Sequence, residues 1–170
     1  MKQTITHQQL MSFRQNGKIQ FEGVEVEDKA QIATLAEKKR DLWRSSPFLK
    51  TVILQMWAPL VIELTKARGI CLACDQWYDE APVEEPIDKR FGFQGLIAFT
   101  AYSWQHKTLD VVTPSVLITT LSFPCYVVAF GSDICRYILN PLDPYNQTSK
   151  RLGYAYGDRL NNQNNPFIYP

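Results

Sequence analysis

The sequence predicts an α+β domain in which N-terminal helices cover an antiparallel β-structure. Helical patterns fill about residues 1–69, whereas short β-branched and aromatic runs follow one another over about residues 70–160. Turn residues separate these runs at regular intervals, which is typical of a β-sandwich or barrel and not of alternating βαβ units. No linker divides the two parts. We therefore expect a single domain over residues 1–170 with the helices packed on one sheet.

The composition excludes several classes of protein. The chain has 170 residues, with 45% hydrophobic and 21% charged side chains, which is enough for a buried core and typical of a soluble globular domain. A net charge of +1 offers no electrostatic footprint for nucleic acid or an anionic membrane, so we expect neither as a partner. The first residues lack the apolar core of a signal peptide, and no apolar run is long enough to span a bilayer. The sequence therefore predicts a cytoplasmic protein with reduced cysteines.

Four helices are predicted before residue 70. Thr6 has the side chain of an N-cap and Gly17 that of a helix stop, so they bound the first helix. A serine before Pro47 marks the start of the third helix, and the fourth begins near Pro59. Apolar spacing completes the pattern. The predicted helices cover residues 6–16, 27–46, 45–55 and 58–69, with a short strand at residues 18–24.

Seven strands are predicted after residue 69. Each is a run of β-branched or aromatic residues bounded by proline, glycine or asparagine. The runs are ICLACDQWY (70–78), FQGLIAFTAY (93–102), TLDVV (108–112), SVLITTLSF (115–123), CYVVAF (125–130), ICRYIL (134–139) and RLGYAY (151–156).

Histidine poverty limits the chemistry that the chain can perform. His7 lies at the start of a predicted helix and His106 beside a predicted turn, and we expect both to be exposed. No GxSxG nucleophile motif and no glycine-rich phosphate loop is present. The acidic stretch at residues 79–88 is broken by prolines and is expected to be solvated. The basic stretch KKR at residues 38–40 is flanked by acidic residues and is expected to form a solvated helix face.

The four cysteines are expected to be buried and inert. Cys71 and Cys74 form a CxxC, but they lie within a strand-like run, where residues three apart face opposite sides of the sheet. Cys125 and Cys135 do not form a second CxxC, so a four-cysteine zinc site is not predicted. Free cysteine usually behaves as a small hydrophobic residue.

Three segments carry a resemblance to a known family. They are MSFRQNGKIQFEGVEVEDKAQIATLAEKKRDLW (11–43), ICLACDQWYDE (70–80) and LDPYNQTSKRLGYAY (142–156). In their order of helices, sandwich strands and a closing Asn–Arg segment they resemble the non-haem Fe(II)/2-oxoglutarate-dependent oxygenases, in particular the phytanoyl-hydroxylase-like branch. The whole chain is similar to an uncharacterised chlamydial protein family that shares this fold without the usual key residues. The resemblance implies a double-stranded β-helix (jelly-roll) with N-terminal helices on one sheet.

The resemblance also identifies candidate site residues. Its iron motif, His-x-Asp, falls on Phe93–Gln94–Gly95, and no histidine precedes Asn146 where the distal ligand is expected. We therefore predict no metal, no cofactor and no oxygenase activity. Arg151 occupies the place of the family's 2-oxoglutarate-binding arginine and is expected to hold a carboxylate or phosphate. The ligand-binding candidates are Arg151, Asn146, Phe93, Gln94 and Asp75.

These observations favour a scaffold of unknown biological role that binds a small anionic ligand or a protein partner. One alternative for Arg151 is an ordinary surface arginine paired with Asp133, Asp143 or Asp158. A second function is an enzyme of atypical chemistry that uses carboxylates such as Asp75, Asp133 or Asp143 in the same cavity. A third is a metal-dependent DNA-binding repressor, against which the near-neutral charge and the dispersed cysteines count.

Overall fold

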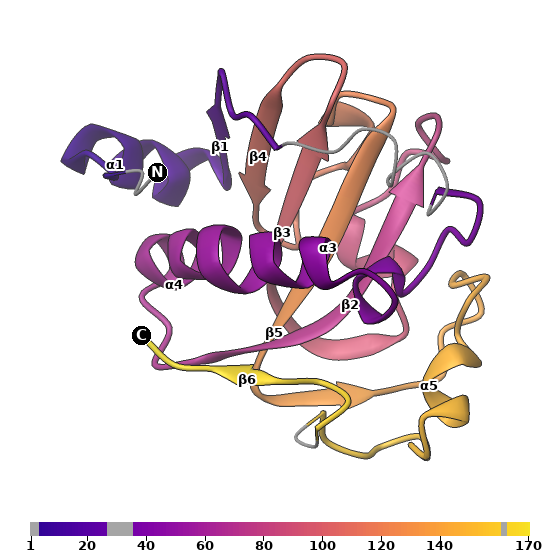
Figure 1. The fold of residues 1–170 in the computed structure, drawn as a ribbon. Helices are drawn as coiled ribbons and strands as arrows, with labels where there is room; N and C mark the ends of the chain where they lie inside the picture. The colour runs from indigo at the N-terminus through magenta and orange to yellow at the C-terminus, as the bar shows by residue number, and fades with distance from the viewer. Residues whose placement is uncertain (1–3, 27–35, 161–162) are drawn as a thin grey trace.

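A computed structural model describes residues 4–26, 36–160 and 163–170, and it combines helices with one curled antiparallel sheet. The strands are β1 (Lys18–Phe21), β2 (Ile70–Tyr78), β3 (Phe93–Ser103), β4 (Thr108–Val112), β5 (Cys125–Tyr137) and β6 (Phe167–Ile168). Within the sheet their order is β1-β4-β3-β5-β2-β6. A long helix lies across one face of this sheet (Figure 1). The predicted mixture of helices and antiparallel strands, with a helix on one sheet, is confirmed.

Helix α1 (His7–Asn16) matches its prediction at both ends. The Thr6 side chain accepts a hydrogen bond from the Gln9 N–H, and the Gln9 side chain accepts one from the Thr6 N–H, which completes a capping box. Gly17 ends the helix in a left-handed conformation with a φ of 67°, where its N–H donates to the Phe13 carbonyl. The predicted strand β1 follows directly.

The helices predicted on either side of residue 57 form one continuous helix. It consists of α3 (Pro47–Val52), a π turn (Ile53–Trp57) and α4 (Ala58–Thr65). Ser46 caps its start by accepting from the Leu49 N–H, as predicted. In the π turn the Ala58 N–H donates to the Ile53 carbonyl. This wider turn accommodates Pro59, which has no N–H and would otherwise break the helix.

The helix predicted over residues 27–46 lies outside the described residues up to residue 35. Ala36 is helical, and the prediction is wrong from residue 37 onward. Lys39 and Asp41 have positive φ angles of 61° and 58°, and a 3₁₀ turn follows at Leu42–Arg44. The backbone here pairs with the edge of β2 instead. The Asp41 N–H donates to the Asp75 carbonyl, and the Trp77 N–H donates to the Lys39 carbonyl. Sheet pairing therefore overrides the helical pattern of the sequence.

Two of the seven predicted strands are wrong and two others merge. CYVVAF and ICRYIL form the single strand β5, which continues through Gly131. SVLITTLSF is a loop with a 3₁₀ turn at Ile118–Thr120. RLGYAY begins at the end of a short helix, α5 (Thr148–Arg151), and continues in turns. The apolar residues of both segments, Ile118 and Tyr154 among them, cover the face of the sheet opposite the long helix, so their apolar character reflects burial without strand pairing.

The sheet buries side chains on both faces. On the helix-covered face, Trp57 packs against Tyr102 and Tyr126 with ring centroids 5.8 and 5.9 Å apart. On the loop-covered face, Val127 and Ala129 of β5 pack beneath the loops that follow β2, β4 and β5. Alternation along β5 produces this division, because successive side chains of a strand point to opposite faces.

The helix Pro47–Thr65 is long and apolar enough, by length and composition, to cross a membrane, so the prediction that no apolar run reaches this length is wrong. Half of its most apolar window is buried within the protein, and a core helix of a soluble protein meets the same criterion. The packing of Trp57 on the sheet is that of such a core helix. The chain therefore looks like a small soluble domain; its predicted cytoplasmic location stays a prediction.

Candidate functional site

Two of the predicted site residues, Phe93 and Gln94, share a shallow groove at the start of β3. The groove has a volume of about 450 Å³ and includes Leu139 and Asn140. The Phe93 ring is buried and lies 6.2 Å from the ring of Tyr137, whereas Gln94 is exposed. Neither Phe93 nor the neighbouring glycine carries a side chain that ligates a metal.

Asn146 lies beside this groove, but its side chain is used within the fold. Its amide donates to the Ile138 carbonyl over 2.9 Å, and its Oδ1 accepts from the Asn140 N–H and the Tyr156 hydroxyl. Its backbone carbonyl also accepts from the Tyr137 hydroxyl. These bonds fix the loop that follows β5 and leave little of the amide for a ligand.

Arg151 lies at the end of α5 and is exposed. It is in a helix and not on the predicted closing strand. Among the described residues it forms no ion pair within 4 Å with Asp133, Asp143 or Asp158, so the predicted surface pairing is absent. Its role in binding an anion stays a prediction.

Asp75 lies on the helix-covered face, away from the other predicted residues. Its carboxylate accepts hydrogen bonds of 2.7 Å from the N–H groups of Leu42 and Trp43, and a further one from the Tyr126 hydroxyl. Complete burial raises the pKa of Asp75 to about 7, although these three donors lower it. Asp75 therefore fastens the 3₁₀ turn at Leu42–Arg44 to the sheet.

Asp143 belongs to a buried network around Arg40. The Arg40 guanidinium donates to Asp143 over 2.6 Å and to the Gln76 side chain over 2.7 Å. It also lies 5.2 Å from the ring centroids of Phe91 and Tyr145. Only 7% of Arg40 is exposed, so the prediction of a solvated basic face at residues 38–40 is wrong for this residue. Such burial requires a paired and hydrogen-bonded charge, which the network supplies.

The carboxylates proposed for an atypical enzyme do not converge. Asp75 is on the helix-covered face, Asp143 is paired with Arg40 at the opposite face, and Asp133 is exposed on β5. Each of the two buried acids is held by donors from the fold itself.

The four cysteines are free and buried, as predicted, but the arrangement of the CxxC differs from the prediction. A β-bulge between Leu72 and Cys74 places Cys71 and Cys74 in the same loop-covered core. The Cys71 and Cys135 thiols are hydrogen-bonded to each other, which lowers the pKa of Cys71 and raises that of Cys135. A Cβ at Gly131 would clash with Cys135, so this glycine leaves room for the pair.

No group of three or more His, Cys, Asp or Glu side chains that could hold a metal ion occurs within residues 4–26, 36–160 and 163–170. His7 and His106 are both exposed, as expected. The donors present in this part of the chain therefore do not fit the iron site that an oxygenase fold implies.

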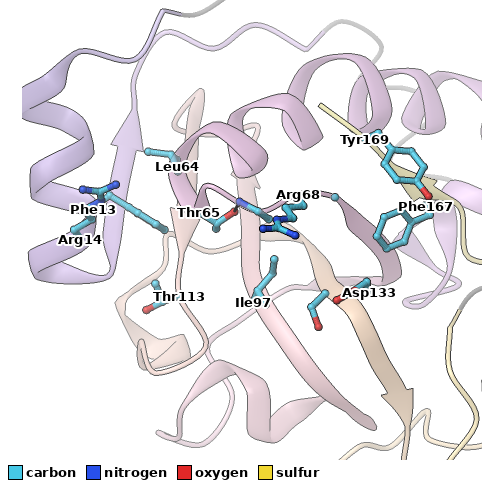
Figure 2. Close-up of a pocket in the computed structure, with 13 residues that line it drawn as sticks. Phe13, Arg14, Leu64, Thr65, Arg68, Ile97, Thr113, Asp133, Phe167 and Tyr169 are labelled. Atoms are coloured by element: carbon cyan, nitrogen blue, oxygen red, sulfur yellow. Dashed lines mark hydrogen bonds between the residues drawn. The ribbon is translucent and has the colours of Figure 1, made fainter.

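A larger cavity than this groove lies on the helix-covered side of the sheet (Figure 2). We call it the arginine pocket, and its volume is about 910 Å³. Its walls come from the end of α1, the end of α4 and the loop after it, the strands β3 and β5, and the C-terminal segment. The lining side chains that carry the argument below are Phe13, Arg14, Arg68, Ile97, Asp133 and Phe167.

Charge is distributed unevenly around the arginine pocket. Figure 2 shows Arg14 on the α1 side, Arg68 near the middle, and Asp133 on the side of Phe167. Within the described part of the chain, none of these three charged side chains forms an ion pair or a side-chain hydrogen bond. All three are exposed, and the half-buried Ile97 forms an apolar floor between them. The pocket therefore combines an apolar surface with a net positive rim.

Reasoning from the sequence missed this pocket. Arg14 and Arg68 each lie near the end of a helix, where a surface arginine is unremarkable. The C-terminal aromatic residues Phe167 and Tyr169 follow a polar stretch, and no periodicity links them to the arginines. Only the return of the C-terminal segment to β2, where Phe167 pairs with Cys71, brings these residues together.

Similarity to solved structures gives the fold a wider context. No family model and no curated protein matches the sequence. The structure of CT296 from Chlamydia trachomatis matches with a TM-score of 0.61 at 15% identity, over 78% of this chain and 98% of that one. The non-heme alpha ketoglutarate dependent carbocyclase SnoK from nogalamycin biosynthesis matches with a TM-score of 0.73 at 11% identity, over 96% of each chain. The non-heme alpha ketoglutarate dependent epimerase SnoN, also from nogalamycin biosynthesis, matches with a TM-score of 0.61 at 12% identity, over 94% of this chain and 97% of that one.

The chain has the fold of these non-heme alpha ketoglutarate dependent enzymes. The predicted likeness to oxygenases and to a chlamydial protein is thereby confirmed for the fold. At identities of 9–16% the likeness carries no statement about activity. Membership of the chlamydial family and the loss of the iron ligands stay predictions.

Proposed function

We propose that this chain is a ligand-binding protein built on an oxygenase-type jelly-roll, and that it does not perform iron- and 2-oxoglutarate-dependent oxidation. The likeness to SnoK and SnoN supports the jelly-roll. The identities of Phe93 and Gly95 support the loss of the His-x-Asp motif, because a phenyl ring does not ligate iron and glycine has no side chain. The protein instead binds a small, largely apolar molecule in the arginine pocket.

The observation that carries this proposal is the arginine pocket itself. A cavity of about 910 Å³ falls within the range of small-molecule sites, which are concave, mostly apolar and supplied with a few polar groups. Apolar side chains from four separate elements meet here: Phe13, Leu64, Ile97 and Phe167. The pocket is open to solvent and its lining side chains do not fill it, so the space is accessible to a ligand.

Two other functions have less support. The atypical enzyme requires acids that converge, whereas Asp75, Asp133 and Asp143 lie in three separate places. No observation favours the DNA-binding repressor, and a protein partner stays an untested alternative to a small ligand.

A fluorescent probe tests the proposal directly. N-phenyl-1-naphthylamine is neutral and apolar, and its fluorescence rises when it leaves water. We expect saturable binding of one probe per chain. Ile97→Trp fills the floor of the pocket and should abolish this binding. Ile134→Trp is the matched control, because Ile134 is 56% exposed on the same sheet and does not line the pocket.

The two variants separate pocket binding from adhesion to the surface. Circular dichroism and urea denaturation establish that both remain folded. Absence of saturable binding, or equal binding by Ile97→Trp and the unchanged protein, would refute the proposed function.

A further inference from the structure

We propose that the ligand of the arginine pocket is an organic acid with an apolar body, whose anionic group is held between Arg14 and Arg68. This inference rests on the proposed function and adds the chemical class of the ligand. It assigns the anion to a place in the fold other than Arg151.

The state of the two arginines supports this assignment. Elsewhere in the described chain, the buried Arg40 and the half-buried Arg90 each have an acidic partner. Arg40 pairs with Asp143, and Arg90 lies 3.8 Å from Glu85. Arg14 and Arg68 line one cavity and have no such partner in the parts of the chain that the structure describes. Their planar guanidinium groups offer five donors each, and these match the oxygens of a carboxylate, sulfonate or phosphate.

The positions of the charges also define the orientation of the ligand. Asp133 repels an anion from the side of the pocket near Phe167, so the acidic group faces the α1 side, where Arg14 lies (Figure 2). The two arginines and one aspartate give the lining a net charge of +1, which a monoanion neutralises. The apolar body then lies over Ile97 toward Phe167.

The lining explains why the body of the acid is apolar. Phe13 and Leu64 line the pocket and are almost fully buried, and Ile97 is half-buried. Two aromatic side chains, Phe167 and Tyr169, also line the pocket, and their ring centroids are 5.0 Å apart. Aromatic side chains favour a flat, apolar surface, which a fused-ring or other planar acid presents. A small hydrophilic anion leaves most of this wall in contact with water.

Two probes that differ only in charge test the inference. The first, 8-anilinonaphthalene-1-sulfonate, has the ring system of N-phenyl-1-naphthylamine together with one sulfonate. We expect the sulfonate probe to bind more tightly than the neutral one. Arg14→Gln and Arg68→Gln should each weaken the binding of the sulfonate probe by roughly tenfold, as the loss of a charge-assisted hydrogen bond implies. Neither substitution should change the affinity for the neutral probe by more than about twofold.

Arg151→Gln is the matched control. It removes the same charge from an exposed arginine that also lacks an ion pair among the described residues, but lies on α5 outside the pocket. This substitution should not change the affinity for either probe. Raising the salt concentration to about 1 M should weaken the sulfonate probe and spare the neutral one, because screening acts on the charged contact.

The outcomes distinguish the inference from the proposed function. If both probes bind equally in all variants, the pocket binds ligands, but the inference that the ligand is an organic acid is wrong. If neither probe binds, the proposed function itself is wrong. If Arg151→Gln alone weakens the sulfonate probe, the anion belongs to α5 and the inference is overturned. Loss of sulfonate binding in Arg14→Gln and Arg68→Gln alone supports it.

Discussion

The charged groups at the two ends of strand β2 are in opposite situations: within the described part of the chain, those at one end have partners, and those at the other end do not. At its C-terminal end, residues 39–43 fold around the strand, and two buried charged groups meet partners there: Asp75 accepts from two backbone N–H groups, and Arg40 pairs with Asp143. At its N-terminal end, Gly69 opens onto the arginine pocket, where Arg14 and Arg68 have no ion-pair partner within the described residues. Buried and paired charges hold a fold together, whereas accessible and unpaired charges on an apolar cavity are available to a ligand.

This comparison separates two kinds of arginine that look alike in the sequence. Arg40 follows two lysines in a basic run, and Arg68 follows a helix. One is 7% exposed and fixed by four groups, and the other is exposed. Substitutions at the two ends of β2 should therefore affect different properties: the free energy of unfolding at one end and the affinity for a ligand at the other.

The largest effect is expected from Arg40→Met. This change leaves Asp143 buried without its cation, and removal of one partner of a buried ion pair typically costs about 3–5 kcal/mol of unfolding free energy. Urea denaturation followed by tryptophan fluorescence measures it. Lys39→Met is the control, because Lys39 pairs with an exposed carboxylate, Asp79, and should lose less than about 1 kcal/mol.

A second variant sharpens this prediction. Arg40→Met combined with Asp143→Leu removes both charges, so most of the lost stability should return. A single Arg40→Met variant as stable as the unchanged protein would show that the network does not hold residues 39–43 to β2.

A smaller effect, with a distinct dependence on pH, is expected from Asp75→Asn. An amide cannot accept from both the Leu42 and Trp43 N–H groups through two oxygens, so one buried donor is left without a partner, at a cost of about 1–3 kcal/mol. The folded protein holds the Asp75 proton up to a pKa of about 7, whereas the unfolded chain releases it near its ordinary pKa. Between these two values the folded state binds more protons, so the unfolding free energy falls as pH rises from about 4 to about 7.

The difference between the two proteins isolates this contribution. Other carboxyl groups titrate in both, so their effects cancel when the unfolding free energies are subtracted at each pH. The unchanged protein should lose stability relative to Asp75→Asn over this interval. Parallel pH profiles would show that Asp75 has an ordinary pKa in the folded state.

Much of the fold was predictable from local patterns. Thr6 and Gly17 bound α1, and the runs at residues 70–78, 93–102 and 108–112 became β2, β3 and β4, since capping chemistry and alternation act over a few residues. The errors arose where distant partners decide the structure. Residues 39–41 pair with β2 despite their helical pattern, and Tyr154 is buried under the sheet without becoming part of it.

The candidate site was predictable only in part, for the same reason. Phe93 and Gln94 do share a groove, because they are adjacent in the chain. The arginine pocket is lined by residues at positions 14, 68, 97, 133 and 167, and their spacing in the sequence does not predict that they lie together. Arg151 was predicted to bind an anion because it matches the position of the family's arginine, yet its segment folds as the helix α5 and not as a strand.

The smallest effect on stability is expected where the effect on binding is largest. Arg14→Gln and Arg68→Gln remove exposed charges that form no ion pair within the described chain, so each should change the unfolding free energy by no more than about 0.5 kcal/mol. Without a ligand the two cations repel across one cavity, and removing either relieves that repulsion at low salt. Urea denaturation at low and high salt measures this, with Arg151→Gln again as the control. A loss above about 1 kcal/mol in either pocket variant would assign that arginine to the fold, because a side chain kept for a ligand contributes nothing to the stability of the free protein.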